Sequence, residues 1–195
     1  AILAGDALLT YSFQMIADTP ENLLSPAQKV ELINHLARAA GPEGMVGGQT
    51  ADMEGEGKSL TLDELKYIHA HKTGKMLSFS VVAGAIIAGA EEQTMKELER
   101  FSQHLGLAFQ IRDDILDLEG HEEKLGKKIG SDESNQKTTY PSLLTLKGAK
   151  KALEEEITAA KHHLEMTGLK TDLLLDITDL VAERVREVSE RYGVP

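Results

Sequence analysis

Apolar residues recur with the period of an α-helix along almost the whole chain. The first stripe, with a spacing of four residues, consists of Leu3, Ala7, Tyr11 and Met15. Further periodic segments cover 26–40, 45–53, 79–90, 94–119, 141–147, 149–166 and 171–192, and one more helix starts after Thr61 and carries Leu65, Ile68 and Thr73. The sequence has no β-hairpin signal and no repeat of fixed length. We therefore predict an all-α helical bundle, with residues 1–195 forming a single domain.

Local signals mark where two of these helices begin. Ser25 and Pro26 are a favourable N-cap and first helical residue. Thr61 and Glu64 have the spacing of a capping box. The stretch 120–137 is polar and rich in Gly and Lys, and we predict a loop there that lies over the ends of the helices.

The composition agrees with a helical protein and narrows the classes of partner. Apolar residues make up 41% of the chain and aromatic residues only 4%, and the abundant Leu, Ala, Glu and Lys favour helix over sheet. The net charge of −11 argues against a nucleic-acid partner, which requires a basic face. The net charge does not exclude an anionic small substrate, because lysines and metal ions can reverse the sign of the electrostatic potential in one cleft.

The chain contains no cysteine, so disulfides, thiolate metal sites and thiol catalysis are excluded. This is compatible with a reducing compartment, and we expect a cytoplasmic protein. No apolar run reaches the length of a bilayer span, so we expect no membrane-spanning segment. The chain opens with Ala1 and Ile2 as if in the middle of a helix, so these residues do not show whether a targeting signal precedes them.

Carboxylates gather near the end of the helix predicted for 94–119. Asp113 and Asp117 are four residues apart and share one face, while Asp114 stands four residues after Gln110. Apolar side chains cover the other directions, so we expect this helix to be buried. Buried carboxylates are costly unless a cation pairs with them. Oxygen ligands without nearby His or Cys favour Mg²⁺ over Zn²⁺, although an exposed acidic helix end explains the spacing equally well.

Three lysines flank this helix in the sequence. Lys72 lies in an earlier predicted helix, Lys127 lies in the loop between Gly126 and Gly130, and Lys137 follows that loop. Taken singly, each lysine is best explained as a solvated surface charge. Taken together beside the carboxylate helix, they predict a diphosphate site, with Mg²⁺ between two negative walls and lysines on the phosphate oxygens.

The ordered set of segments resembles the trans-isoprenyl diphosphate synthases of the bacterial farnesyl or geranylgeranyl type. The matching segments are 1–9, 47–52, 72–74, 109–117, 125–127 and 137–141, and the resemblance extends from residue 1 to about residue 186. It implies a helical bundle of the isoprenoid synthase type that lacks its N-terminal helices. It also implies a homodimeric, Mg²⁺-dependent prenyltransferase that condenses isopentenyl diphosphate with dimethylallyl or geranyl diphosphate to give farnesyl diphosphate.

The resemblance also implies a role for individual residues. The second aspartate-rich motif of the family, which binds Mg²⁺, matches Asp113, Asp114 and Asp117. The diphosphate-binding residues match Lys72, Lys127, Lys137 and Gln49, and the catalytic positions match Lys72, Thr73 and Gln110, the last two beside the allylic carbon. Asp52 matches a further element of the cleft. In this chemistry, metal ions and lysines stabilise the diphosphate leaving group, the alkene attacks the allylic cation, and a proton is lost.

Parts of the family pattern do not occur in these 195 residues. The first aspartate-rich motif, the basic residues that bind isopentenyl diphosphate and the residues that set product length are absent, and the tail after Arg186 has no assigned role. We therefore expect the 195-residue chain to be inactive by itself. His69 and His71 are expected to be structural or surface residues, because alternate residues of a helix point about 200° apart.

Three other functions remain open. A class I terpene cyclase uses the same bundle and metal chemistry, but it would lack the set of Lys127 and Lys137 and carry an Asn/Ser/Glu metal triad, which we do not find. A non-catalytic helical subunit of a prenyl synthase would have lost cleft residues, and none within this span is lost. An acidic helical interaction module would show no Mg²⁺-dependent diphosphate binding.

Overall fold

The computed structural model describes residues 1–119 and 137–182, and these residues are helical apart from short connections. The helices are α1 (Ile2–Asp18), α2 (Pro26–Ala40), α3 (Met45–Gly55), α4 (Leu62–His69), the π-helical turn η1 (Ala70–Gly74), α5 (Lys75–Ala88), α6 (Glu92–Glu119), α9 (Tyr140–Met166) and α10 (Asp172–Ala182). No strand occurs within the two described ranges. The prediction of an all-α fold is therefore confirmed.

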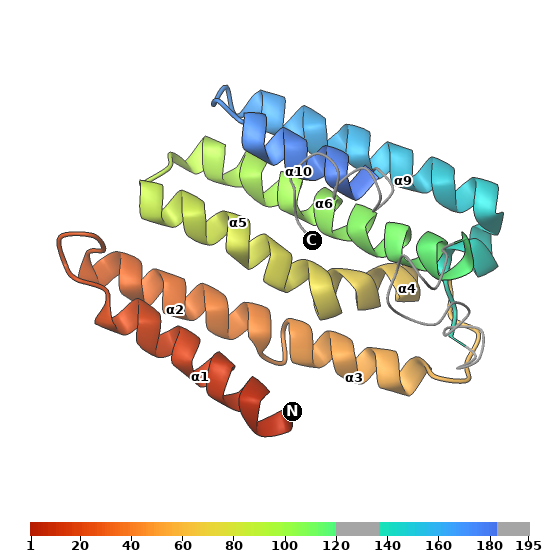
Figure 1. Ribbon diagram of the computed structural model, residues 1–195, viewed down its shortest axis with the longest axis horizontal. Coiled ribbons are helices and arrows are strands. Elements are labelled where there is room, and N and C mark those ends of the chain that lie inside the picture. The colour runs from red at the N-terminus through yellow and green to blue at the C-terminus, as the bar shows by residue number, and fades with distance from the viewer. Residues whose placement is uncertain (120–136, 183–195) are drawn as a thin grey trace.

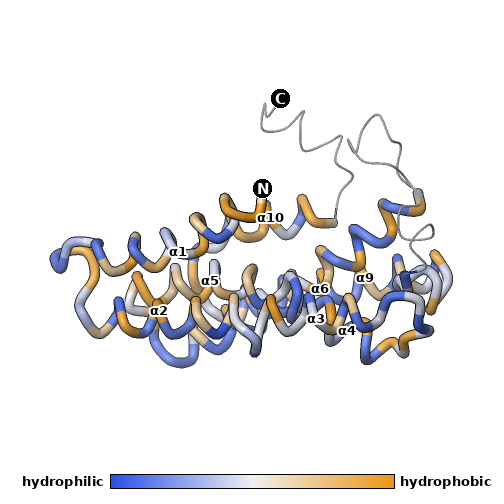
Figure 2. Tube along the Cα trace, turned by 90° about the horizontal axis from the view of Figure 1, so that it is seen from below, coloured by the Kyte–Doolittle hydropathy of each residue, from blue (hydrophilic) through white to orange (hydrophobic). Residues whose placement is uncertain are grey.

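Four long helices lie side by side in the order α2, α5, α6 and α9 (Figure 1). The short helices α3 and α4 continue the lines of α2 and α5 toward one end of the molecule. Both α1 and α10 lie on the same side of this layer (Figure 2), at its opposite edges in the view of Figure 1. Within the described chain, α10 packs on α6 and α9, whereas α1 contacts mainly α2.

The predicted helix starts are confirmed in atomic detail. Ser25 Oγ accepts a hydrogen bond from the backbone N–H of Gln28 at 3.3 Å, and the Gln28 side chain returns to the Ser25 N–H. Thr61 Oγ1 accepts from the N–H of Glu64 at 3.3 Å, and Glu64 accepts from the N–H of Thr61 at 2.8 Å. Each pair satisfies two backbone donors that the first helical turn leaves open.

The break predicted between 141–147 and 149–166 lies earlier than expected. Within α9, Thr145 has non-helical dihedral angles, φ 64° and ψ 162°, so the kink falls three residues before Gly148. Thr145 Oγ1 accepts from the N–H of Gly148 at 3.4 Å and caps the next turn. The break was predicted at Gly148 because glycine weakens a helix, whereas the capping residue Thr145 marks the start of the second helical segment.

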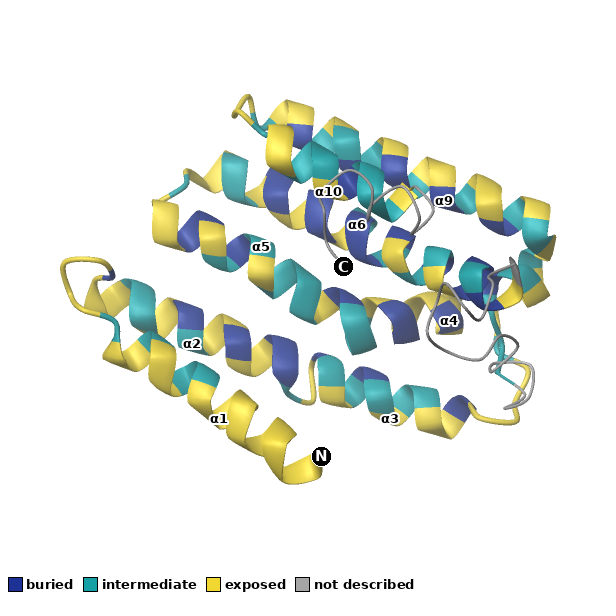
Figure 3. Ribbon diagram, in the orientation of Figure 1, coloured by how far each residue is buried: buried dark blue, intermediate teal, exposed yellow. Residues whose placement is uncertain are grey.

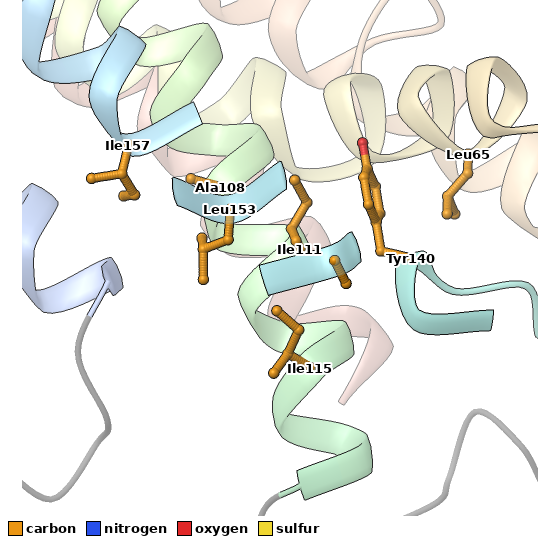
Figure 4. Close-up of a cluster of buried hydrophobic side chains, with 8 residues drawn as sticks. Leu65, Ala108, Ile111, Ile115, Tyr140, Leu153 and Ile157 are labelled. Carbon is orange, nitrogen blue, oxygen red and sulfur yellow. The ribbon is translucent and has the colours of Figure 1, made fainter. Parts of the chain in front are cut away.

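The largest core surrounds α6. Figure 4 shows side chains from α4, α6 and α9 that meet at this helix. The buried members are Leu65, Ala108, Ile111, Ile115, Tyr140, Ala149, Leu153 and Ile157. By contrast, α1 has no buried residue, and Leu3, Tyr11 and Met15 of its predicted stripe are more than half exposed (Figure 3).

Candidate active site

A single π-helical turn places Lys72 and Thr73. The rod from α4 to α5 is continuous, but at 70–74 it widens to the π-helical pattern. Two glycines allow other helices to approach this turn. A Cβ at Gly48 of α3 would lie 2.2 Å from the backbone nitrogen of Lys72, and a Cβ at Gly106 of α6 would lie 3.1 Å from the Cα of Gly74. The turn is therefore held directly between the backbones of α3 and α6.

Two of the three predicted lysines meet at one carboxylate oxygen. Lys72 Nζ lies 2.7 Å from Asp52 Oδ2, and Lys137 Nζ lies 3.0 Å from the same atom. The two lysines are far apart in the sequence, and they reach Asp52 from η1 and from the segment before α9. Lys127 lies outside the described residues.

The charge of Asp52 follows from these neighbours. Burial opposes ionisation of its carboxyl group and by itself raises the pKa. The hydrogen bonds and positive charges of Lys72 and Lys137 outweigh that effect, so the pKa of Asp52 lies below its usual value of 3.8. Asp52 is therefore an anion at neutral pH, held between two ammonium groups.

The segment that carries Lys137 is fixed at two further points. Thr138 Oγ1 donates to the backbone carbonyl of Lys58 at 3.2 Å and accepts from the N–H of Leu60 at 3.3 Å. The N–H of Tyr140 donates to Asp114 Oδ2 at 2.8 Å. The start of α9 is thus tied both to the loop after α3 and to α6.

The three aspartates of α6 have different surroundings. Asp114 is buried, and its Oδ2 lies 3.3 Å from Nε2 of His69 as well as accepting from Tyr140. Asp117 is also buried, whereas Asp113 is exposed. All three match the metal-binding motif in the sequence, but Asp114 is engaged in a buried pair that joins α4, α6 and α9.

The exposed side of α6 forms one wall of a recess of about 240 Å³. Phe109, Asp113 and Leu116 of α6 face Ile177, Leu180 and Val181 of α10 across it. The expectation that this helix is buried all round is therefore wrong on this side, where Phe109 is 44% exposed. Within the described chain, α10 is the helix that packs over this part of α6, and it leaves the recess open.

The carboxylates of α6 are oxygen donors of the kind that Mg²⁺ prefers. No group of three or more His, Cys, Asp or Glu side chains that could hold a metal occurs among the described residues. Mg²⁺ does not require such a cage, because it usually takes one or two carboxylates and completes its octahedron with water and substrate phosphates. Asp113 and Asp117, one helical turn apart, fit that pattern.

The remaining predicted residues surround the glycine contacts. Gln49 follows Gly48 on α3, Thr73 lies in η1, and Gln110 stands one turn after Gly106 on α6. All three predicted residues are half-buried. The backbone contacts at the glycines thus bring the elements that carry Gln49, Thr73 and Gln110 together, while the roles assigned to these residues stay predictions.

The two histidines have structural partners. The His69 ring stacks on the ring of Tyr140 with centroids 5.9 Å apart, next to Asp114. Burial, together with the negative charges of Glu156 and Asp114, raises the pKa of Tyr140, so its hydroxyl stays protonated. His71 stacks on Tyr67 at 4.0 Å, and its Nδ1 lies 2.8 Å from the Tyr67 carbonyl oxygen.

Two features of this site were not predicted from the sequence. Asp52, which lies one turn after Gly48 and joins the two lysines, had no defined role. The pairing of Asp114 with His69, 45 residues away in the sequence, was also not predicted. The adjacent Gly47 and Gly48 within a helix were the available signal, because small residues there permit close contact between backbones.

These helices define an all-α protein in which Lys72 and Lys137 come together at Asp52. The sequence matches the family model of polyprenyl synthetases over residues 1–173, and the chain belongs to this family. The family membership predicted from the sequence motifs is thereby confirmed.

Two relatives and one solved structure illustrate the similarity. Farnesyl diphosphate synthase of Geobacillus stearothermophilus is 60% identical over 184 residues, and that of Bacillus subtilis (strain 168) is 53% identical over 184 residues. Each alignment covers 94% of this chain, and the chain spans 62% of the length of each relative. A Helicobacter pylori geranyltransferase, solved with magnesium and isoprenyl diphosphate, has a TM-score of 0.79 at 32% identity, covering 97% of this chain and 60% of its own. Among the helices of residues 1–119 and 137–182, none combines the length and the apolar character of a membrane-spanning segment.

Proposed function

We propose that the protein is a prenyltransferase that condenses isopentenyl diphosphate with dimethylallyl or geranyl diphosphate to give farnesyl diphosphate. The observation that carries this proposal is the convergence of Lys72 and Lys137 on one oxygen atom from two distant parts of the chain. Two ammonium groups held together suit the several oxygens of a diphosphate. The 60% identity to a farnesyl diphosphate synthase supports the choice of product.

Asp113 and Asp117 would hold the Mg²⁺ ion of this reaction from the α6 side. When bound, Mg²⁺ supplies positive charge next to the departing diphosphate. Asp114 would support the site without binding the metal, because its carboxylate contacts His69 and the start of α9. Lys127, which is outside the described residues, is proposed to bind the diphosphate as well.

The other side chains of the chain would bind and shield the reacting groups. Each ammonium group has three N–H donors, so Lys72 and Lys137 would bind the diphosphate and stabilise the charge that grows on it as the allylic C–O bond breaks. Thr73 and Gln110 would lie beside the allylic carbon, with Gln49 near the diphosphate. Apolar side chains such as Phe109 and Leu116 would limit access of water to the cation. The alkene of isopentenyl diphosphate then forms the new C–C bond, and the released diphosphate takes the proton.

A homodimer and a cytoplasmic location are part of the proposal. The large apolar side chains exposed along α1 support an association surface there: Ile2, Leu3, Leu8, Tyr11 and Met15. Light scattering of the complete protein at micromolar concentration would show the mass of a dimer, and a monomer at all concentrations would contradict this part.

Product analysis tests the activity directly. The complete protein is incubated with isopentenyl and geranyl diphosphates, with Mg²⁺ or with excess chelator. We expect a C15 diphosphate that forms only with Mg²⁺. Absence of any condensed product with Mg²⁺ present would refute the proposed function, and a cyclised hydrocarbon would instead indicate a terpene cyclase.

A further inference from the structure

We infer that Asp52 is a positioning residue that holds the ammonium groups of Lys72 and Lys137 at the spacing of one diphosphate; this inference rests on the proposed function. A single oxygen, Asp52 Oδ2, lies 2.7 Å from one nitrogen and 3.0 Å from the other. The two nitrogens are therefore no farther apart than these two distances combined. Oxygens on the two phosphoryl groups of one diphosphate can contact both.

The carboxylate is what makes this arrangement favourable. Two ammonium groups this close repel each other, and repulsion is stronger where water is partly excluded. The ionised Asp52 offsets that repulsion and leaves the three groups with one net positive charge for the ligand. An ammonium group has three N–H donors, so a single bond to Asp52 does not exhaust the donors of either lysine.

Burial makes the link stiff. The side chain of Asp52 is only 16% exposed, compared with 32% for Lys72 and 26% for Lys137. Water therefore does not readily replace either lysine at the carboxylate. A flexible lysine stem that is anchored near its charged end loses less freedom when it binds the ligand.

The backbone around Asp52 is a suitable frame for this task. Asp52 stands on α3, one turn after Gly48, whose missing side chain lets α3 touch the backbone of Lys72. The loop after α3 holds Thr138, the neighbour of Lys137, through Lys58 and Leu60. Asp52 is therefore fixed with respect to both lysines by contacts other than its own ion pairs.

Steady-state kinetics of the complete protein test the inference through Asp52→Asn, which keeps the size of the side chain and removes its charge. The matched control is Asp179→Asn, which removes a carboxylate that binds Lys161 at 2.5 Å between α10 and α9. We expect Asp52→Asn to raise KM for the allylic diphosphate by about tenfold, the effect of one charge-assisted hydrogen bond, with a smaller change in kcat. The control should change neither constant.

A second substitution separates positioning from simple support of the fold. If Asp52 acts through the lysines, the effect of Asp52→Asn on KM shrinks in a Lys137→Met background, because one of its two links is already gone. An unchanged or lowered KM in Asp52→Asn overturns the inference, as does a full tenfold effect in the Lys137→Met background. Loss of the folded state of Asp52→Asn by circular dichroism overturns it as well, since the role is then structural.

The proposed function and the role of Asp52 can be refuted independently of each other. If the wild-type protein makes no condensed product, the proposed function fails. Calorimetric titration of wild type and Asp52→Asn with inorganic diphosphate and Mg²⁺ then still tests the role of Asp52. About tenfold weaker binding by the variant would support it, and equal or tighter binding would refute it.

Discussion

The two sides of α6 between Phe109 and Asp117 carry similar residues in different environments. On the inner side, Ile111, Ile115 and Asp114 are buried, and the carboxylate has protein donors. On the outer side, Asp113 and Phe109 line an open recess. Adjacent aspartates on a helix point about 100° apart, so neighbours in sequence belong to different environments. The comparison teaches that adjacent aspartates of one motif differ in burial: Asp114 supports the fold, whereas Asp113 is the carboxylate proposed to bind Mg²⁺.

The largest expected effect belongs to the outer side. Asp113→Ala removes the exposed carboxylate proposed as a Mg²⁺ ligand, so kcat should fall by orders of magnitude while the melting temperature hardly changes. Turnover with varied Mg²⁺ and a thermal melt measure both quantities. Near-normal turnover would break the comparison, because the outer side would then have no chemical role.

The apolar residues of α6 should show the same contrast in stability. Ile115 is fully buried and Phe109 is 44% exposed. Ile115→Ala should lower the free energy of unfolding by about 3 kcal/mol, and Phe109→Ala by less than about 1 kcal/mol. Urea unfolding of the complete protein measures both. Equal costs would show that a further element covers the outer side.

Asp114→Ala sharpens the comparison on the inner side. The change leaves the N–H of Tyr140 and the ring of His69 without their buried acceptor and should cost about 2 kcal/mol of stability. Asp114→Asn is the control, because its amide oxygen still accepts from Tyr140. Unchanged stability together with lost Mg²⁺-dependent turnover would instead indicate that Asp114 binds Mg²⁺ as Asp113 is proposed to do.

The smallest effect concerns pH. The folded-state pKa of Asp52 lies below its usual value of 3.8, because its lysine partners outweigh the effect of burial. Its ion pairs therefore contribute stability in full above the ordinary pKa, and this contribution is lost as pH falls through the lower folded-state value. Urea midpoints of wild type and Asp52→Asn should differ by a constant amount at neutral pH and converge in acid. A difference that grows on acidification would reverse the sign and refute the ion pairing.

Much of the fold follows from local patterns. The capping pairs at Ser25 and Thr61 and the long periodic segment that became α6 depend on residues close in sequence, so they were predicted with nearly the right bounds. The kink at Thr145 was misplaced, because its dihedral angles depend on how both halves of α9 pack. The π-helical turn was missed, since one extra residue in a helical rod hardly disturbs the apolar pattern.

The candidate site was predictable where it depends on spacing and less so where it depends on tertiary contacts. The shared face of Asp113 and Asp117 follows from helical geometry alone. The grouping of Lys72 with Lys137 came from their positions on either side of the carboxylate helix in the sequence and from the resemblance to a family, since no periodicity relates residues so far apart. The partner that joins them, Asp52, and the pairing of His69 with Asp114 became visible only when α3, α4, α6 and the start of α9 were placed together.

The most direct test of the account is a crystal structure of the complete protein with Mn²⁺ in place of Mg²⁺ and a non-hydrolysable allylic thiodiphosphate. We predict an anomalous manganese peak at the carboxylate of Asp113, and one diphosphate within hydrogen-bond distance of both Lys72 Nζ and Lys137 Nζ, which still contact Asp52. A diphosphate bound elsewhere, or a manganese ion held by Asp114 with Asp113 left unoccupied, would contradict the assignment of the two sides of α6.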